Sequence, residues 1–493
     1  MNLAIVLSPL LAVGLGALGL MVADALSSRK GGFALGAATI LLAAAVLAAG
    51  VWLGGGAESL QAAALAPWIL VDGLTLYMTM LLCVGGALSA LLAGGYLTEH
   101  RLERCEFYVL LLLSVFGAMT LVAAGDALTL FLGLETMSLG VYSLTAFRRQ
   151  NARSVEGGLK YFLLSSFAAA LLLYGFALLY GATGHTDLAG IGAATSMQAG
   201  RSPMFVFGAV LVLVGLAFKV SAVPFHAWTP DAYEGAPTPA TTLMAVMVKA
   251  GAFAVLLRVL RVCFSDPTWT SWASGWPPVV ATLAAVTMTV ANLVASRQDS
   301  VKRMLSYSSI AHAGYMLVGL SAVVRSRTPG ETSVLFYLLA YALSTAGAFG
   351  ALILCGSHGR EAVSYEDLSG LGKRHPLTAF VFSICVLSLA GIPPTAGFFA
   401  KWFVFKAAVD AGLYSLVVLA LVNSVIAAYY YLRVLVFIYM REPAAGAPIA
   451  VPMRSGYVLF AVILSTASVI ALGLAPSGSL SLVEFAVAPS AGG

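Results

Sequence analysis

The residues of this sequence that could do chemistry are a few lysines, one glutamate and two histidines placed inside long apolar runs. One stretch holds both Lys219 and Lys249, with Pro224 and His226 between them. A lysine at the centre of a bilayer costs about 2.5 to 3.5 kcal/mol to insert, so an intramembrane lysine is a functional-site hypothesis by default. Amines, carboxyls and imidazoles all bind and release protons. The residue types therefore point to proton transfer within a membrane.

Four further residues extend this set of candidates. Glu135 lies about nine residues into the apolar run that begins near residue 126, and of the 21 acidic residues it alone sits that deep. Lys401 follows a Pro-Pro pair in GIPPTAGFFAK, and His312 lies among hydroxyl side chains in YSSIAHAGY. Lys160 sits only one turn into its run. Its amine could join a relay or could simply extend back to the membrane surface.

The deep lysines suit proton transfer better than fixed charge. Of eight lysines three lie deep, whereas no arginine of eighteen clearly does so. Arginine stays protonated in proteins, but a lysine can release its proton. Structural roles stay open, because a buried glutamate can remain protonated, and His226 and His312 can bind freed carbonyls or hydroxyls. We expect a proton relay centred on the deep lysines and the glutamate.

The elements that must hold these residues are membrane-spanning helices. The 493-residue chain is 60% hydrophobic and 10% charged, with a mean hydropathy of +0.95. A spanning helix needs about 20 apolar residues. We find fourteen such runs, which begin near residues 3, 31, 70, 106, 126, 157, 203, 237, 277, 301, 331, 377, 412 and 455. The sequence therefore predicts an all-α polytopic membrane protein with about 14 transmembrane helices. The first run has no positively charged start, so we interpret it as a span rather than a secretory signal.

Two of the predicted spans must be interrupted. Pro224 has no N–H, and its ring clashes with the carbonyl four residues earlier, so the seventh helix should break after Lys219. In the twelfth span, Pro393 and Pro394 free carbonyls in the same way, and nearby glycines permit an unwound segment. A break in hydrocarbon survives only against protein or a water-filled cavity. Two breaks five spans apart, each beside a lysine, are typical of two inverted five-helix repeats.

This pattern divides the chain into four parts. We expect an N-terminal group of three helices over residues 1–105, a first repeat over 106–262, a second repeat over 275–441, and a last helix with its tail over 455–493. Lysine and arginine are retained in cytoplasmic loops. The alternate loops that start with residues 27–31 carry fifteen of these side chains, and the loops on the other side carry five. Both termini should therefore lie on the periplasmic side.

The net charge and the cysteine content give no sign of nucleic-acid, metal or redox-cofactor binding. The net charge of +5 follows from the loop asymmetry and requires no nucleic acid. The five cysteines are scattered, without the spacing of a disulfide framework, a zinc site or an iron–sulfur cluster. A dinucleotide-like GLGALG lies inside the first apolar run without a preceding strand, where small residues for helix packing explain it better. We expect no redox centre and no metal in this chain.

Four segments resemble the antiporter-like membrane subunits of bacterial respiratory complex I, and most closely the N type. They are ALTLFLGLETMSL, GLKYFLLSSFAAALLLYG, FKVSAVPFHAWTPDAYEGAPTP and SVKRMLSYSSIAHAGY. The resemblance covers nearly the whole chain and implies fourteen helices in two inverted repeats, with the seventh and twelfth helices discontinuous. It also implies a central polar axis, with Glu135, Lys219, Lys249, Lys401, and further Lys160 and His226 as members.

The resemblance also implies an activity and a setting. It implies a non-redox, proton-translocating subunit of NADH:quinone oxidoreductase in the bacterial inner membrane, coupled to quinone reduction elsewhere. NADH, FMN, iron–sulfur clusters and quinone would be bound by other subunits. The neighbours would be K-, J- and M-type subunits and the lateral helix of the L type.

Alternatives stay open within and beyond this family. The M type has a glutamate where Lys401 stands, and the L type has a long C-terminal lateral helix. A subunit of a multisubunit sodium/proton antiporter would share both broken helices and the buried lysines. A scaffold without transport would tolerate replacement of those lysines.

Overall fold

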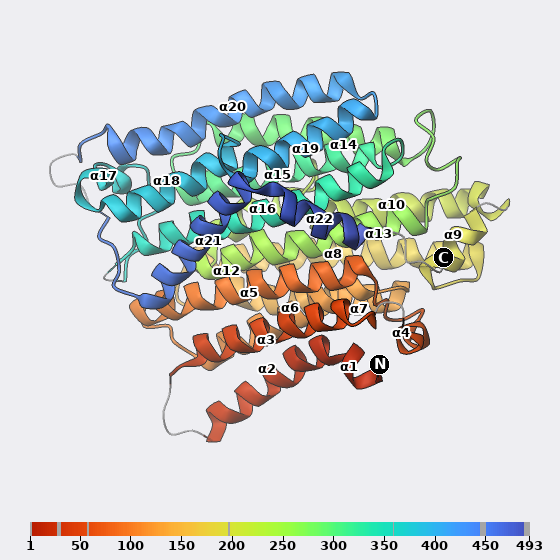
Figure 1. The fold of residues 1–493 in the computed structure, drawn as a ribbon, viewed down its shortest axis with the longest axis horizontal. Helices are drawn as coiled ribbons and strands as arrows, with labels where there is room; N and C mark the ends of the chain where they lie inside the picture. The colour runs from red at the N-terminus through yellow and green to blue at the C-terminus, as the bar shows by residue number, and fades with distance from the viewer. Residues whose placement is uncertain are drawn as a thin grey trace.

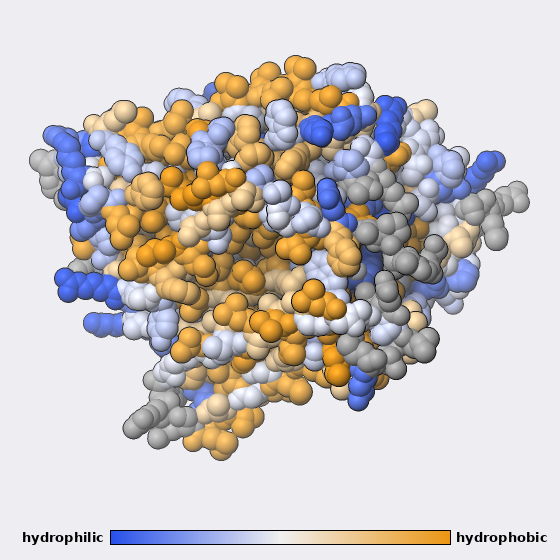
Figure 2. All heavy atoms as spheres, in the orientation of Figure 1, coloured by the Kyte–Doolittle hydropathy of each residue, from blue (hydrophilic) through white to orange (hydrophobic). Residues whose placement is uncertain are grey.

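The computed structural model describes residues 2–26, 31–56, 59–195, 198–357, 359–443 and 450–487. These residues form a bundle in which most long helices run roughly along one direction (Figure 1). Hydrophobic side chains cover much of the middle of the face drawn in Figure 2, and hydrophilic ones gather mainly toward the two ends of the helices. Such a surface fits a protein whose sides are surrounded by lipid. The predicted loop residues Arg29 and Lys30 and the tail after residue 487 lie outside the described residues.

Eleven helices in the described ranges are long and apolar enough to cross a membrane. They are α2 (Ser8–Leu26), α3 (Phe33–Leu53), α5 (Gly73–Glu99), α6 (Cys105–Ala123), α7 (Ala127–Thr145), α8 (Ala152–Thr183), the eighth predicted span (Thr238–Val262), α14 (Trp276–Ala295), α16 (Arg327–Leu354), α20 (Tyr414–Tyr439) and α21 (Gly456–Leu474). Each coincides with a predicted run. The all-α, multi-pass membrane protein is thereby confirmed.

The three other predicted spans are less regular. The tenth, α15 (Val301–Ala322), is long enough but carries two charges at its start and several hydroxyl groups. The seventh is divided into α10 (Pro203–Lys219) and α11 (Trp228–Gly235), and the twelfth into α18 (Pro376–Ala390) and α19 (Ala396–Asp410). Both discontinuous helices are confirmed, whereas the count of fourteen spans stays a prediction.

Short helices connect or cover the spans. They are α1 (Leu3–Val6), α4 (Leu60–Leu65), α9 (Leu188–Thr195), η2 (Gln198–Arg201), η4 (Glu366–Leu368), α17 (Leu371–Arg374) and α22 (Pro476–Val487). Of these, α22 packs on α5 and α16. In Figure 1, α21 and α22 cross the face of the bundle turned toward the viewer. A Cβ on Gly73 would lie 2.7 Å from the Ala486 carbonyl oxygen, so the start of α5 needs a glycine there.

The two predicted five-helix units share one packing scheme. In the first unit α6 packs on α7, α7 on α8, and α8 on both α10 and α11. In the second unit α14 packs on α15, α15 on α16, and α16 on both α18 and α19. Because each unit has five spans, an odd number, the second unit starts from the opposite side of the membrane. This agrees with inverted repeats. The four residue ranges into which the sequence analysis divides the chain stay predictions.

Ion pairs anchor one end of the eighth span. Arg258 donates to both carboxylate oxygens of Asp72, at 2.8 and 2.9 Å, and to Thr75 Oγ1 at 2.8 Å. Arg261 pairs with the buried Glu331 of α16 at 3.2 Å. The last turns of this span are thus tied both to the N-terminal helices and to the second unit.

Candidate functional site

The first broken helix is closed by hydrogen bonds from protein. Helix α10 ends at Lys219. The Trp228 indole N–H donates to the Phe218 carbonyl at 3.2 Å, and the Val223 N–H donates to Thr287 Oγ1 of α14 at 2.9 Å. The break therefore finds its polar partners inside the bundle, as a break in hydrocarbon must.

Lys219 and Glu135 form a buried polar group near this break. Only 2% of the Lys219 surface is exposed. Its Nζ donates to Ser138 Oγ at 2.8 Å, Tyr142 OH at 3.4 Å and Ser165 Oγ at 2.6 Å. Glu135 precedes Ser138 and Tyr142 by three and seven residues on α7, so it shares their helix face and interacts electrostatically with Lys219. Among the described contacts no direct ion pair joins the two: the Lys219 amine bonds hydroxyl groups, and Glu135 Oε1 is buried without a hydrogen-bond partner.

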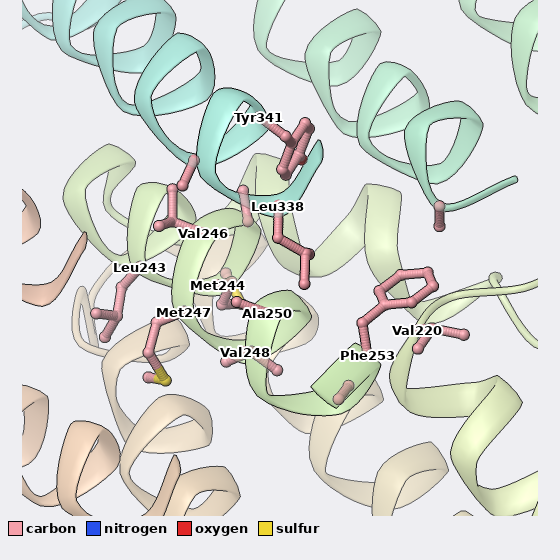
Figure 3. Packing of buried hydrophobic residues seen from close by; sticks show 14 of the residues in the cluster. Val220, Leu243, Met244, Val246, Met247, Val248, Ala250, Phe253, Leu338 and Tyr341 are labelled. Carbon is pink, nitrogen blue, oxygen red and sulfur yellow. The ribbon is translucent and has the colours of Figure 1, made fainter. Parts of the chain in front are cut away.

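Lys249 directly follows a π-helical turn. The eighth span consists of α12 (Thr238–Leu243), the π-helix η3 (Met244–Val248) and α13 (Lys249–Val262). Such turns hold one extra residue and are frequent at functional sites. Figure 3 shows the apolar side chains of this turn, with Tyr341 on the neighbouring α16. Lys249 Nζ donates to the carbonyl and hydroxyl oxygens of Ser309 on α15, and Tyr341 OH donates to the same hydroxyl at 2.8 Å.

His312 joins hydroxyl groups from two other helices. Its Nδ1 lies 2.7 Å from Tyr337 OH of α16, and its Nε2 lies 3.0 Å from Tyr431 OH of α20. Which nitrogen carries the proton depends on the tautomer. The ring also interacts electrostatically with both Lys249 and Lys401. His312 therefore lies within electrostatic reach of two deep lysines.

Lys401 stabilises the second break. Its Nζ donates to the Ala390 carbonyl, which precedes Pro394 by four residues, at 2.8 Å. The amine lies 5.0 Å from the centre of the Tyr315 ring, one turn beyond His312 on α15. A Cβ on Gly397 would lie 1.8 Å from the carbonyl oxygen of Ser388, so a glycine lets α19 approach the end of α18.

Comparison with known proteins places this geometry in a family. A family model described as NADH:quinone oxidoreductase/Mrp antiporter, TM, matches residues 124–427. NADH-quinone oxidoreductase subunit N 1 of Sorangium cellulosum is 61% identical over 502 residues, which cover 99% of each chain. This chain belongs to the NADH-quinone oxidoreductase subunit N family. Subunit N of Myxococcus xanthus is 40% identical over 445 residues, which cover 84% of each chain.

Solved structures agree with this membership of the subunit N family. A chain of respiratory complex I from Thermus thermophilus with bound aureothin is 35% identical, with a TM-score of 0.80, and the match covers 97% of this chain and 99% of that one. A chain of the Mrp complex from Dietzia is 24% identical, with a TM-score of 0.84 over 99% of this chain and 97% of that one. At that identity the second likeness shows the fold alone. The predicted resemblance is confirmed.

Two of the predicted site residues of this subunit N chain have no described hydrogen bond or ion pair with the buried lysines. Lys160 keeps 45% of its side chain exposed and pairs with Glu156 at 2.7 Å and with Asp231 at 2.8 Å. These contacts favour an anchored surface amine. His226 is half-buried in the segment between α10 and α11, next to the exposed Pro224. Their roles in transport stay predictions.

Sequence reasoning missed most of the hydroxyl partners of the lysines. Ser309 is one of the hydroxyl residues noted beside His312 in YSSIAHAGY, but nothing in the sequence pairs it with Lys249. Tyrosine occurs throughout apolar helices, so nothing in the sequence singles out Tyr341. It also missed Asn292, whose side-chain N–H donates to Tyr315 OH at 3.1 Å and whose carbonyl accepts from Tyr430 OH at 3.0 Å. An asparagine late in a predicted span was the available signal.

The polar groups of the site are of types that can bind and release protons. In the described ranges no group of three or more His, Cys, Asp or Glu side chains could hold a metal ion. The assembled groups are amines, hydroxyls, an imidazole and one carboxyl.

The break at Pro393 and Pro394 offers a first test. Replacing both with alanine should favour a continuous helix, because the missing backbone N–H groups return and the steric clash is removed. The Ala390 carbonyl would then bond within the helix instead of with Lys401. We expect slower NADH-driven proton uptake in vesicles, with the complex still assembled.

A matched control is Pro376→Ala, since this proline stands at the first position of α18, where it is tolerated without a break. Normal proton uptake by the double variant would show that the break is not needed for transport.

Proposed function

We propose that this chain is a proton-translocating, non-redox subunit in the membrane arm of NADH:quinone oxidoreductase. The observation that supports this best is the arrangement of Lys249, His312 and Lys401, two buried lysines within reach of one buried histidine. Glu135 and Lys219 form a second polar group beside the first break. Buried titratable groups have a standing cost in a membrane, and such groups mark ion pathways.

The chemistry of the relay follows from the choice of side chains. Among the described ion pairs none involves Lys249 or Lys401, and both amines bond neutral oxygens instead. Such an amine can give up its proton without breaking an ion pair. A carboxylate about 6 Å from an ammonium group stabilises it by roughly 3 kcal/mol at an effective dielectric of about 20. A change in the distance between Glu135 and Lys219 would therefore control whether Lys219 holds its proton.

The orientation follows from the basic loops. We place the loops rich in lysine and arginine in the cytoplasm and both termini in the periplasm of a bacterial inner membrane. Protons would move between these two compartments. NADH, FMN, iron–sulfur clusters and quinone would be bound by other subunits, whose electron transfer supplies the free energy.

The partners we propose are membrane subunits of the K, J and M types and the lateral helix of the L type. Both helix breaks leave prolines exposed on the bundle, at Pro224 and at Pro393 and Pro394. Unwound backbone is poorly suited to face lipid, so a protein partner is the better cover there.

A subunit of a sodium/proton antiporter is the second candidate, because the matching family model names both kinds of protein. The 61% identity to a subunit N favours the first. To decide, the chain is affinity-tagged in its own bacterium, and the purified assembly is reconstituted into vesicles. We expect co-purifying NADH oxidation activity and acidification that depends on NADH and quinone. Co-purification with antiporter subunits, with sodium/proton exchange in the absence of NADH, would overturn the proposal.

A further inference from the structure

A second buried charged cluster lies at the end of the bundle that carries the basic loops. Its centre is Glu361, in the segment between α16 and α17. Glu361 Oε1 accepts hydrogen bonds from Tyr96 OH at 2.6 Å and from Thr238 Oγ1 at 2.7 Å. The same oxygen pairs with Arg148 and, at 3.6 Å, with Lys302 Nζ. None of these residues belongs to the relay described above.

Lys302 is as buried as the relay lysines. Only 1% of its surface is exposed, and its amine donates to the Ala236 carbonyl at 2.7 Å. Glu361, in contrast, keeps 18% of its side chain exposed. The pair therefore has one member that reaches solvent and one that lies inside the protein. This is the placement needed to pass a proton inward.

The charges around Glu361 come from three elements. Arg148 follows α7, Lys302 begins α15, and His100 ends α5 with its ring stacked on Tyr96 at 4.1 Å between centroids. Burial raises the pKa of Glu361, but the charges of Lys302 and Arg148 outweigh this effect and hold the pKa below its ordinary value. Glu361 is thus a carboxylate at neutral pH and can accept a proton.

Two helices lead from this cluster to Lys249. On α15, Ser309 comes seven residues after Lys302, two turns further on the same face, or about 10 Å along the helix axis. On the eighth span, Thr238 comes eleven residues before Lys249. Buried hydroxyl side chains line these two helices between the ends: Thr241, Thr242, Ser306 and Ser308. A hydroxyl both donates and accepts hydrogen bonds, so it can pass a proton or hold a water molecule.

We infer that Glu361 and Lys302 form the intake site through which protons from the basic end of the bundle reach Lys249. The inference rests on the proposed proton transport and adds the residues where protons are loaded. The Lys302 ammonium group releases a proton through the hydroxyl groups toward Ser309 and Lys249 and becomes a neutral amine. A proton from water then binds the Glu361 carboxylate and passes to this amine, which restores the carboxylate and the ammonium group.

The Lys302→Arg variant distinguishes a proton intake site from an ion pair that has only a structural role. Arginine keeps the positive charge opposite Glu361 but cannot release a proton. We expect assembled complex whose NADH-driven proton uptake is lower by about tenfold or more, since loss of a positioned proton-transfer group has effects of at least that order. Uptake at the unmutated rate would show that Lys302 is only a fixed charge and would overturn the inference.

Glu361→Gln is the second variant, because its amide carbonyl still accepts hydrogen bonds from Tyr96 and Thr238 but does not titrate. It should lower proton uptake as Lys302→Arg does. Glu361→Asp, which does titrate, should recover part of the rate. The control is Glu366→Gln, an exposed carboxyl five residues away, which should leave uptake unchanged. If both Lys302→Arg and Glu361→Gln abolish assembly, the cluster is structural and the inference fails.

Lys249→Arg in the same membranes distinguishes this inference from the proposed function. If Lys249→Arg blocks transport while Lys302→Arg and Glu361→Gln pump normally, only the intake site is wrong. If Lys249→Arg also pumps normally, the relay itself is in doubt.

Discussion

Lys249→Arg is expected to assemble into the complex and to transport protons nearly as poorly as Lys249→Ala. Arginine keeps the positive charge and most of the length, and its N–H groups can still reach the oxygens of Ser309. It stays protonated at any working pH, so it cannot take part in transfer. We expect NADH-driven acidification of reconstituted vesicles to fall by about tenfold or more between pH 6 and 8.

The control for this substitution is Lys406→Arg, on the same residue type at an exposed position of α19. It should leave transport unchanged. Near-normal acidification by Lys249→Arg across this pH range would instead show that Lys249 acts only as a fixed positive charge. The proton path would then run through other groups or through water.

Glu135→Gln and Lys219→Ala should each abolish most proton transport while the complex still assembles. Glutamine keeps the shape of the side chain but removes its charge, so Lys219 loses the carboxylate that interacts with it. Alanine removes the amine from the hydroxyls of Ser138 and Ser165, and the Ser138 hydroxyl keeps its hydrogen bond to the Leu134 carbonyl. We expect a loss of about tenfold or more, measured as proton uptake per NADH oxidised.

An exposed acid in the first turn of α6 supplies the control, since Glu106→Gln removes a carboxyl without touching the buried site. The assignment of the pair is lost if vesicles with either variant at the buried site take up protons at the unmutated rate.

The deep lysines could be predicted because each lies within an apolar run of the sequence. No nearby residue in the sequence offsets the free-energy cost of placing its charge in a membrane. The two breaks could be predicted because proline cannot continue a helix. The partners of the lysines could not, because they come from distant segments. Lys249 binds a serine sixty residues away, and serine is common in apolar helices.

Lys302 is not among the three lysines that the sequence places deep, because it stands at the start of a span next to Arg303, which is the usual position of a surface anchor. In the structure the segment that contains Glu361 folds over it, and this long-range contact buries the amine. The pairing of Lys160 with Glu156, in contrast, follows from their spacing of four residues on one helix.

The π-helical turn before Lys249 has a consequence for the phase of the eighth span. Thr238 ties one end of this helix to Glu361, and Arg258 and Arg261 tie the other end to Asp72 and Glu331. With both ends held, the helix cannot turn as a rigid rod. A π-helical turn takes about one residue more than an α-helical turn, so it accommodates the extra residue and keeps the direction of Lys249 relative to Thr238 close to that in an α-helix with one residue fewer. Deletion of a single residue between Met244 and Val248 would therefore close the π-helical turn to an α-helical one, with Lys249 still directed toward Ser309 and both anchored ends in place.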